Sequence, residues 1–134
     1  MEKNKDAYMD YVCPYCMNTL DNCTCNELQP PYYLIMIDRN IQEHIRILNQ
    51  KGYYTKFSCE GHEGYSFNTY IVFADDYFEN IDMPKKFKYS KKDRKISYIY
   101  SAKLSDEKFR ELKRDNIAEL LKWCNDLPDR SMEN

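Results

Sequence analysis

The sequence predicts an α+β fold: a small, mostly antiparallel sheet with two helices on one face and a zinc knuckle at the N-terminus. Three observations support this class. Short apolar runs rich in aromatic and β-branched residues recur between residues 32 and 100, as in strands. Two longer stretches carry apolar residues at helical spacing. Four cysteines within thirteen residues near the N-terminus provide the ligands that a zinc site requires.

Length and composition limit the organisation of the chain. Its 134 residues suffice for one domain and a small appendage. We expect a flexible lead and zinc knuckle in residues 1–31 and an α+β domain in residues 32–134. The N-terminus lacks the apolar segment of a secretory signal, and no apolar run could cross a bilayer. We therefore expect a cytoplasmic protein, in the host cytoplasm if a phage encodes it, with no membrane contact.

The first helix is expected directly after an apolar strand in residues 32–37. Asp38 or Asn40 is a candidate N-cap for this helix. Gly52 is expected to end it, because glycine readily adopts the left-handed conformation that closes a helix. The apolar face of the helix repeats at helical spacing and consists of Ile41, Ile45 and Leu48.

Four further strands and a long second helix complete the prediction. Residues 53–58 alternate in polarity, residues 70–73 are apolar, and the short loop between them predicts antiparallel pairing. Residues 87–89 and 96–100 flank a charged turn and predict a hairpin. A helix is expected to start near Ser105, to end near Pro128 and to cover the sheet.

The N-terminal cysteines predict a structural zinc site. Cys13 and Cys16 form one pair on a Pro-containing turn, and Cys23 and Cys25 form the second pair. Two such pairs can meet in a tetrahedron around Zn²⁺. Ordinary reduced cysteines and a redox Cys-x-x-Cys motif are the alternatives. A variant keeps Cys13, Cys16 and one of Cys23 or Cys25, and takes the fourth ligand from Cys59 or His62.

The loop from Ser58 to His62 admits three interpretations. It is a strand-end turn permitted by Gly61, or a ligand pocket at the end of a strand, or a catalytic site with Cys59 as nucleophile and His62 as base. The catalytic interpretation lacks a third group to orient the histidine. We therefore predict binding at Ser58, Cys59, Gly61 and His62, and no catalytic residue.

The chain from residue 41 to residue 73 resembles two groups of proteins. Its helix, the segment Lys51-Gly52-Tyr53-Tyr54-Thr55, the loop Phe57-Ser58-Cys59-Glu60-Gly61-His62 and the following strand look like small uncharacterised bacterial and phage proteins with an N-terminal cysteine knuckle. The stretch is also distantly similar to the TYW-three family of wybutosine synthesis, whose loop reads Ser-Cys-Ser-Gly-Arg. Ser58, Cys59 and Gly61 match that loop, and His62 replaces its arginine. This second resemblance implies S-adenosylmethionine binding and tRNA modification.

A basic segment is the last feature of the sequence that suggests a binding surface. Residues 85–95 hold seven Lys or Arg side chains and one Asp, so the segment carries +6 and the rest of the chain −8. Basic side chains interleaved with aromatic ones can hold a phosphate backbone while rings stack on bases. A charged turn is also a common way to protect a sheet edge, and it can dock on an acidic surface, including the chain's own. The candidate residues are Lys86, Lys88, Tyr89, Lys91, Lys92 and Arg94.

Together these features predict a zinc-containing binding module rather than an enzyme, encoded by a phage or mobile element. Its basic hairpin and the loop around Cys59 would engage nucleic acid or a host nucleoprotein. An inhibitor of a host defence system fits this size and composition. The alternative is an RNA-modification or nucleotide-binding protein of TYW-three-like type, with its pocket at Ser58–His62.

Overall fold

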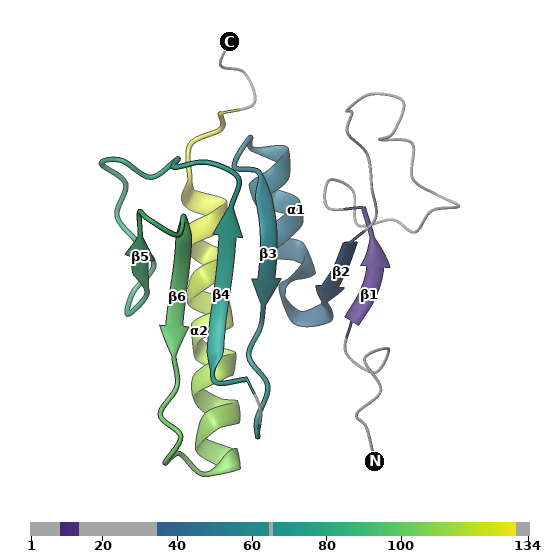
Figure 1. Ribbon diagram of the computed structural model, residues 1–134, viewed down its shortest axis with the longest axis vertical. Coiled ribbons are helices and arrows are strands. Elements are labelled where there is room, and N and C mark those ends of the chain that lie inside the picture. The colour runs from purple at the N-terminus through teal and green to yellow at the C-terminus, as the bar shows by residue number, and fades with distance from the viewer. Residues whose placement is uncertain (1–8, 14–34, 65, 131–134) are drawn as a thin grey trace.

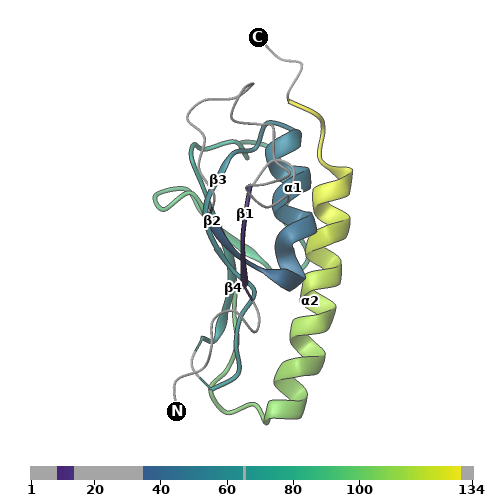
Figure 2. The same ribbon diagram turned by 90° about the vertical axis from the view of Figure 1, so that its right-hand side faces the viewer.

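A four-stranded antiparallel sheet forms the centre of the protein, and two helices pack on one of its faces (Figures 1 and 2). The structure, a computed structural model, describes residues 9–13, 35–64 and 66–130. The sheet has the order β3-β4-β6-β5, and every neighbouring pair is antiparallel. The predicted α+β class is confirmed. The elements are β3 Thr55–Cys59, β4 Asn68–Phe73, β5 Lys88–Ser90, β6 Lys95–Ile99, α1 Gln42–Gln50 and α2 Asp106–Asp126.

A second, two-stranded sheet lies beside the first (Figure 1). It pairs β1 (Met9–Val12) with β2 (Ile35–Asp38) in antiparallel register, with Met9 opposite Asp38. Residues 9–12, expected to belong to a flexible lead, form a strand, which corrects that expectation. Four residues are too few to show a period of two, so only the pairing with β2 identifies them as a strand.

The first helix does not start in the way that the sequence predicts. A short 3₁₀ turn, η3 (Arg39–Ile41), precedes α1, and neither of these two helices has a side-chain N-cap. Asp38 does stand at the N-cap position of η3, but its side chain makes no capping hydrogen bond, and Asn40 lies inside η3. Both side chains instead form hydrogen bonds with the segment that follows β3. The predicted terminator is confirmed, since Gly52 follows the helix with a φ of 93°.

The second half of the chain agrees with the prediction. β5 and β6 form the expected hairpin around residues 91–94. The hydroxyl of Ser105 accepts a hydrogen bond from the Lys108 amide at 3.2 Å and caps α2. Leu127 ends that helix just before Pro128. Acidic residues in the first turn of α2 also interact favourably with the helix dipole.

The core lies between the sheet and the helices. In β4, Thr69, Ile71 and Phe73 are buried and point toward the helices, while the alternate residues lie on the open face. Phe57 and Ile99 on that open face are 63% and 73% exposed. No helix in the described part of the chain is both long and apolar enough to cross a membrane. The most deeply buried apolar side chains include Ile37, Ile41, Ile45, Leu48, Tyr53, Ile71, Phe73, Ile96 and Leu120.

Candidate metal centre

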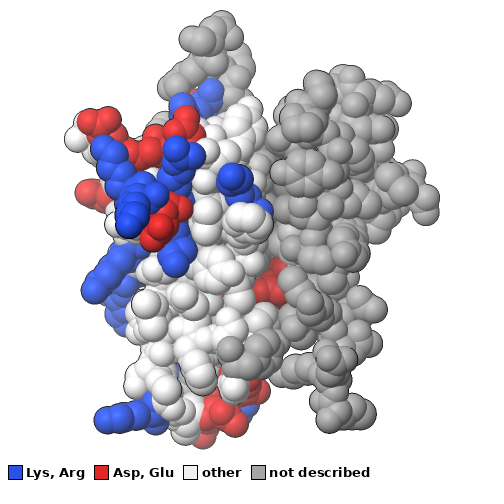
Figure 3. Space-filling model, in the orientation of Figure 1, with Lys and Arg blue, Asp and Glu red and all other residues white. Residues whose placement is uncertain are grey.

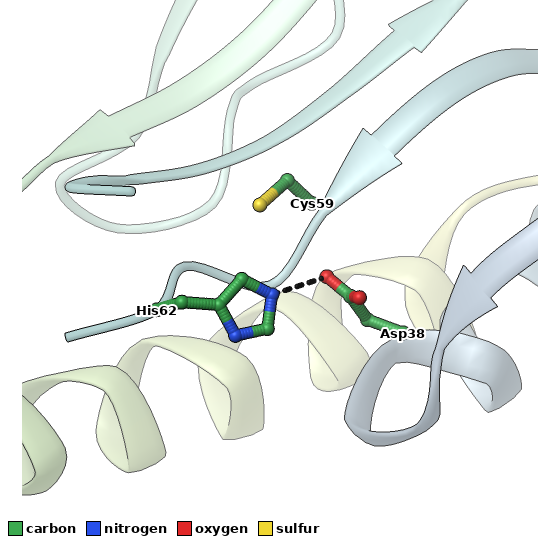
Figure 4. Close-up of side chains that lie close together, drawn as sticks. All are labelled: Asp38, Cys59 and His62. Atoms are coloured by element: carbon green, nitrogen blue, oxygen red, sulfur yellow. Dashed lines mark hydrogen bonds and ion pairs between the residues drawn. The ribbon is translucent and has the colours of Figure 1, made fainter. Parts of the chain in front are cut away.

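Three metal-ligand side chains converge where two strands end. Asp38 is the last residue of β2, Cys59 is the last residue of β3, and His62 lies in the turn after β3. One donor atom from each residue lies within 4.8 Å of the other two (Figure 4). Because β2 belongs to the small sheet and β3 to the large one, the group joins the two sheets. These three residues can hold a metal ion.

The turn after β3 has the backbone geometry needed to bring His62 back toward Cys59. Gly61 is buried with a φ of 91°, a conformation that favours glycine. His62 and Ser66 then exchange two backbone hydrogen bonds of 2.7 and 2.9 Å. The sulfur of Cys59 accepts a hydrogen bond from the Gly61 amide at 3.4 Å and lies 3.3 Å from the Ser66 hydroxyl. These contacts hold the thiol side chain against the turn.

The carboxylate of Asp38 is almost fully buried, with 1% of the residue exposed. Its Oδ2 accepts a hydrogen bond from the Glu60 amide at 2.8 Å and lies 3.0 Å from Nε2 of His62. Its Oδ1 is buried and has no hydrogen-bond partner among the described residues. A buried carboxylate oxygen without a partner is costly. An ion bound beside this carboxylate would supply the missing interaction.

The electrostatics of His62 reflect the two acidic groups beside it. Burial lowers the pKa of His62, but hydrogen bonds and charge interactions with Asp38 and Cys59 outweigh burial and raise the pKa to about 9. Without a metal, the imidazole therefore carries a proton at neutral pH. The same two groups, together with burial, raise the pKa of Tyr70. The site thus places a buried carboxylate beside an imidazole and a thiol, a surrounding that favours a cation there.

The orientation of the imidazole distinguishes a metal site from a catalytic triad. Figure 4 shows the carboxylate of Asp38 and the sulfur of Cys59 on the same side of the ring, the side that carries Nε2. In a nucleophile–base–acid triad, the acid and the nucleophile contact opposite ring nitrogens. Asp38 does supply the third group that the sequence analysis lacked. The arrangement nevertheless fits three ligands around one ion rather than a proton relay.

A second layer of contacts fixes the turn against α2. Glu60, with 1% exposed, accepts hydrogen bonds from the side-chain amide of Asn40 at 2.7 Å and from its backbone amide at 3.3 Å. Lys113 of α2 forms an ion pair with the same carboxylate at 2.5 Å. The carbonyl of Glu60 accepts a hydrogen bond from the hydroxyl of Thr69 at 2.8 Å, and this hydroxyl also bonds the hydroxyl of Tyr100 at 2.7 Å. Outer contacts of this kind orient metal ligands.

The structure separates the four loop residues that the sequence analysis grouped as a binding site. Cys59 and His62 meet in the metal group, and Gly61 shapes the turn between them. Ser58 is opposite the buried Ile71 in the β3–β4 register, so its side chain points to the other face of the strand from that of Cys59. Ser58 is not part of the group.

The predicted four-cysteine site falls mostly outside the described residues. Cys16, Cys23 and Cys25 lie there, and the knuckle stays a prediction. Cys13 is described and fully buried, one residue after β1. Because Met9 is opposite Asp38, Cys13 lies four residues further along the strand, roughly 13 Å from that end. Among the described residues, Cys59 and His62 meet Asp38, and Cys13 is not part of that group. The variant that shares Cys59 or His62 with the knuckle stays a prediction, because it depends on cysteines outside the described residues.

The basic hairpin lies at the sheet edge formed by β5, on the left of Figure 3, where acidic side chains are mixed with the basic ones. Lys86, Lys88 and Lys92 are exposed. The other members contact the protein itself: Tyr89 donates a 2.6 Å hydrogen bond to Asp76, Lys91 lies 3.8 Å from the same carboxylate, and Arg94 donates to the Ala74 carbonyl at 2.9 Å.

The rings beside the hairpin are occupied in packing. Tyr89 makes an edge contact with Phe78, while Phe87 and Tyr100 are 7% and 2% exposed. Tyr98 packs against both Phe87 and Tyr100. Contacts from this hairpin to a nucleic acid would therefore depend on its lysines rather than on stacking.

Sequence reasoning missed Asp38, Glu60 and Lys113 as site residues. One signal was available for Asp38, because a carboxylate directly after a buried apolar strand often belongs to a site rather than to a cap. In the sequence, Glu60 lies between Cys59 and His62. Its side chain is held in the interior by Asn40 and by Lys113 of α2, and these contacts form only in the folded protein. Lys113 lies 53 positions from Glu60, and only the packing of α2 brings them together.

Comparison with known protein families, curated proteins and solved structures gives no match to this chain. The resemblances to small bacterial and phage proteins and to the TYW-three family stay predictions. Function is therefore inferred from the geometry of the site.

Proposed function

We propose that the chain is a zinc-containing binding module in which Asp38, Cys59 and His62 bind one Zn²⁺ ion. The observation that carries the proposal is the convergence of their donor atoms within 4.8 Å in a mostly buried site. A sulfur, a nitrogen and an oxygen ligand form a donor set that zinc accepts, whereas Mg²⁺ and Ca²⁺ prefer oxygen ligands alone. Oδ1 of Asp38, which has no hydrogen-bond partner in the described part of the chain, gives this set an independent reason to bind a cation.

The position of the three ligands indicates a structural role. A bound ion would connect the end of β2 to the turn after β3, and so the small sheet to the large one. These ligands come together only when the chain folds. The free energy of metal binding therefore adds to the free energy of folding. Three ligands leave one position of a tetrahedral ion for water or a further side chain.

Metal content of single variants tests the zinc site. We expect about one zinc per chain to be lost in Cys59→Ser and in Asp38→Asn and retained in Cys124→Ala, which changes a buried helical cysteine outside the group. Cobalt substitution gives a second readout, because the thiolate-to-cobalt absorption of this site should be lost in Cys59→Ser and retained in Cys124→Ala. A further zinc lost in the double variant Cys13→Ser/Cys16→Ser would report the predicted knuckle. Retention of all zinc in both Cys59→Ser and Asp38→Asn would exclude the site.

The partner in this proposal is nucleic acid, held by the exposed lysines of the basic hairpin. Support comes from the excess of six positive charges in residues 85–95 and from the exposure of Lys86, Lys88 and Lys92. Lysines on one edge can neutralise successive phosphates without reading sequence. A host nucleoprotein with an acidic surface is the other partner that this charge distribution suits.

A further inference from the structure

A groove runs between α2 and the turn that carries His62. It consists of two adjoining hollows of about 310 and 300 Å³, which share Asn40, Arg110 and Lys113 as walls. The first hollow continues to Arg114 and Ile117, and the second continues to the buried Glu60 and to His62. This combined space is in the size range of small-molecule sites.

The groove has an excess of positive charge at the end away from the metal group. Arg110, Lys113 and Arg114 are three and four positions apart on α2, so they share one face of the helix. Among the described residues, the walls of the hollow that contains all three include no carboxylate. Glu60 and Glu63 line the other hollow, so the described walls of the groove present three cations and two carboxylates.

The three cations differ in how firmly they are held. Lys113 is tied to the buried Glu60 and is only 18% exposed. Arg110 pairs with Glu63 at 2.8 Å, but both side chains are open to solvent, with 61% and 35% exposed. Such exposed pairs contribute little and exchange partners readily. Arg114 is exposed and has no ion-pair or hydrogen-bond partner among the described residues. Two guanidinium groups are therefore available at the mouth of the groove.

We propose that this groove binds a small phosphorylated molecule of mononucleotide size, with its phosphate between Arg110 and Arg114. Guanidinium groups bind phosphate through paired, charge-assisted hydrogen bonds. Ile117 provides an apolar wall for the rest of the ligand, and Lys113, paired with Glu60, lines the space between the two hollows. Binding requires the groove and not the metal ion, so this inference goes beyond the zinc site and does not depend on it.

Calorimetric titration of the full chain with AMP, inorganic phosphate and adenosine tests the inference. We expect AMP to bind more tightly than adenosine and Arg114→Gln to weaken AMP binding by about tenfold or more, the loss expected for one charged contact. Lys122→Gln removes an exposed lysine of the same helix outside the groove and should leave binding unchanged. Glu63→Gln should tighten binding several-fold, because it releases Arg110 from its present partner.

The opposite signs expected for Arg114→Gln and Glu63→Gln separate recognition from general destabilisation, which would weaken binding in both. Three results would overturn the inference: no binding of AMP or phosphate at millimolar concentration, equal binding of adenosine and AMP, or equal losses in Arg114→Gln and Lys122→Gln. Titration of Cys59→Ser distinguishes the two proposals. The zinc content of this variant reports on the metal site, and its AMP titration reports on the groove. Intact AMP binding is expected even when zinc is lost, and loss of AMP binding together with zinc would overturn the claim that the groove binds without the metal.

Discussion

Nε2 of His62 lies 3.0 Å from Oδ2 of Asp38, although the two residues are 24 positions apart. The contact connects the last residue of β2 with the turn after β3, and Cys59 lies on the same side of the imidazole (Figure 4). Asp38 and Cys59 raise the pKa of His62 to about 9 against the opposing effect of burial, which favours the protonated imidazole at neutral pH when no metal ion is bound. We therefore expect changes in the backbone of this turn, or in the side chains that hydrogen-bond to it, to destabilise the protein.

Alanine at Gly61 should destabilise the protein more than alanine at Gly64. Both glycines have a φ near +90°, so each substitution costs about 1–2 kcal/mol from the backbone alone. A Cβ at Gly61 would also lie 3.2 Å from the hydroxyl oxygen of Thr69, which cannot move freely because it is hydrogen-bonded to Glu60 and Tyr100. A Cβ at Gly64 meets nothing within 4 Å. Urea denaturation of the two variants measures the difference, and equal losses would show that the Thr69 contact is unimportant.

Removing the hydroxyl of Tyr100 should lower the free energy of unfolding by about 1–3 kcal/mol. This hydroxyl is buried and bonds Thr69 at 2.7 Å and the amide of Asn116 at 3.4 Å, so Tyr100→Phe leaves buried polar groups with fewer partners. Tyr98→Phe is the matched control, since the described residues give its hydroxyl no hydrogen bond, and we expect a change within about 0.5 kcal/mol. Thermal unfolding of both variants tests this, and comparable shifts in Tm would contradict it.

Stability should fall below about pH 6.5 because of His44. This side chain is 2% exposed, its Nε2 donates to the Ile117 carbonyl at 2.8 Å, and its Nδ1 has no partner among the described residues. Burial lowers the pKa of His44 below its usual value, although the Ile117 carbonyl, Glu43 and Glu60 oppose this. The unfolded chain therefore binds a proton more readily, so stability is lost from the unfolded pKa of about 6.5 downward and the loss is complete below the folded pKa.

The variant His44→Gln isolates this contribution, since glutamine offers an amide donor to Ile117 but does not titrate. We expect the free energy of unfolding of the natural chain to decrease more steeply between about pH 7.5 and 5 than that of the variant. Chemical denaturation at several pH values provides the comparison. Parallel curves would show that His44 takes up its proton as easily in the folded protein as in the unfolded one.

Charge reversal in the hairpin tests the nucleic-acid proposal. Lys88→Glu/Lys92→Glu changes two exposed lysines that form no ion pair in the described part of the chain. We expect binding to a single-stranded RNA to weaken at least about tenfold, with a shallower dependence on salt because two phosphate contacts are lost. Lys103→Glu/Lys122→Glu makes the same charge change away from the hairpin. Fluorescence anisotropy of a labelled oligonucleotide measures both, and similar losses in the two variants would argue against the hairpin as the binding surface.

Local patterns were enough to predict much of the fold. The charged turn of the hairpin and the cap at Ser105 each depend on neighbours within a few residues. The alternation predicted for residues 53–58 fails at Phe57, because a register shift between Thr55 and Phe57 leaves Phe57 63% exposed, whereas Thr55 is buried. The antiparallel pairing of β3 and β4 agrees with the short connection between them. The strand β1 could not be predicted in this way, because its four residues form a strand only by pairing with β2.

Local sequence was sufficient to place Cys59 and His62 on one tight turn at a strand end, because Gly61 between them permits the turn. Their third partner depends on the three-dimensional packing. Asp38 has the local properties of a helix cap, yet its carboxylate bonds the Glu60 amide and His62 because the end of β2 packs beside the end of β3. Helix capping depends on a few consecutive residues, whereas a three-ligand site depends on the relative position of two sheets, and that position is set by the packing of the whole core.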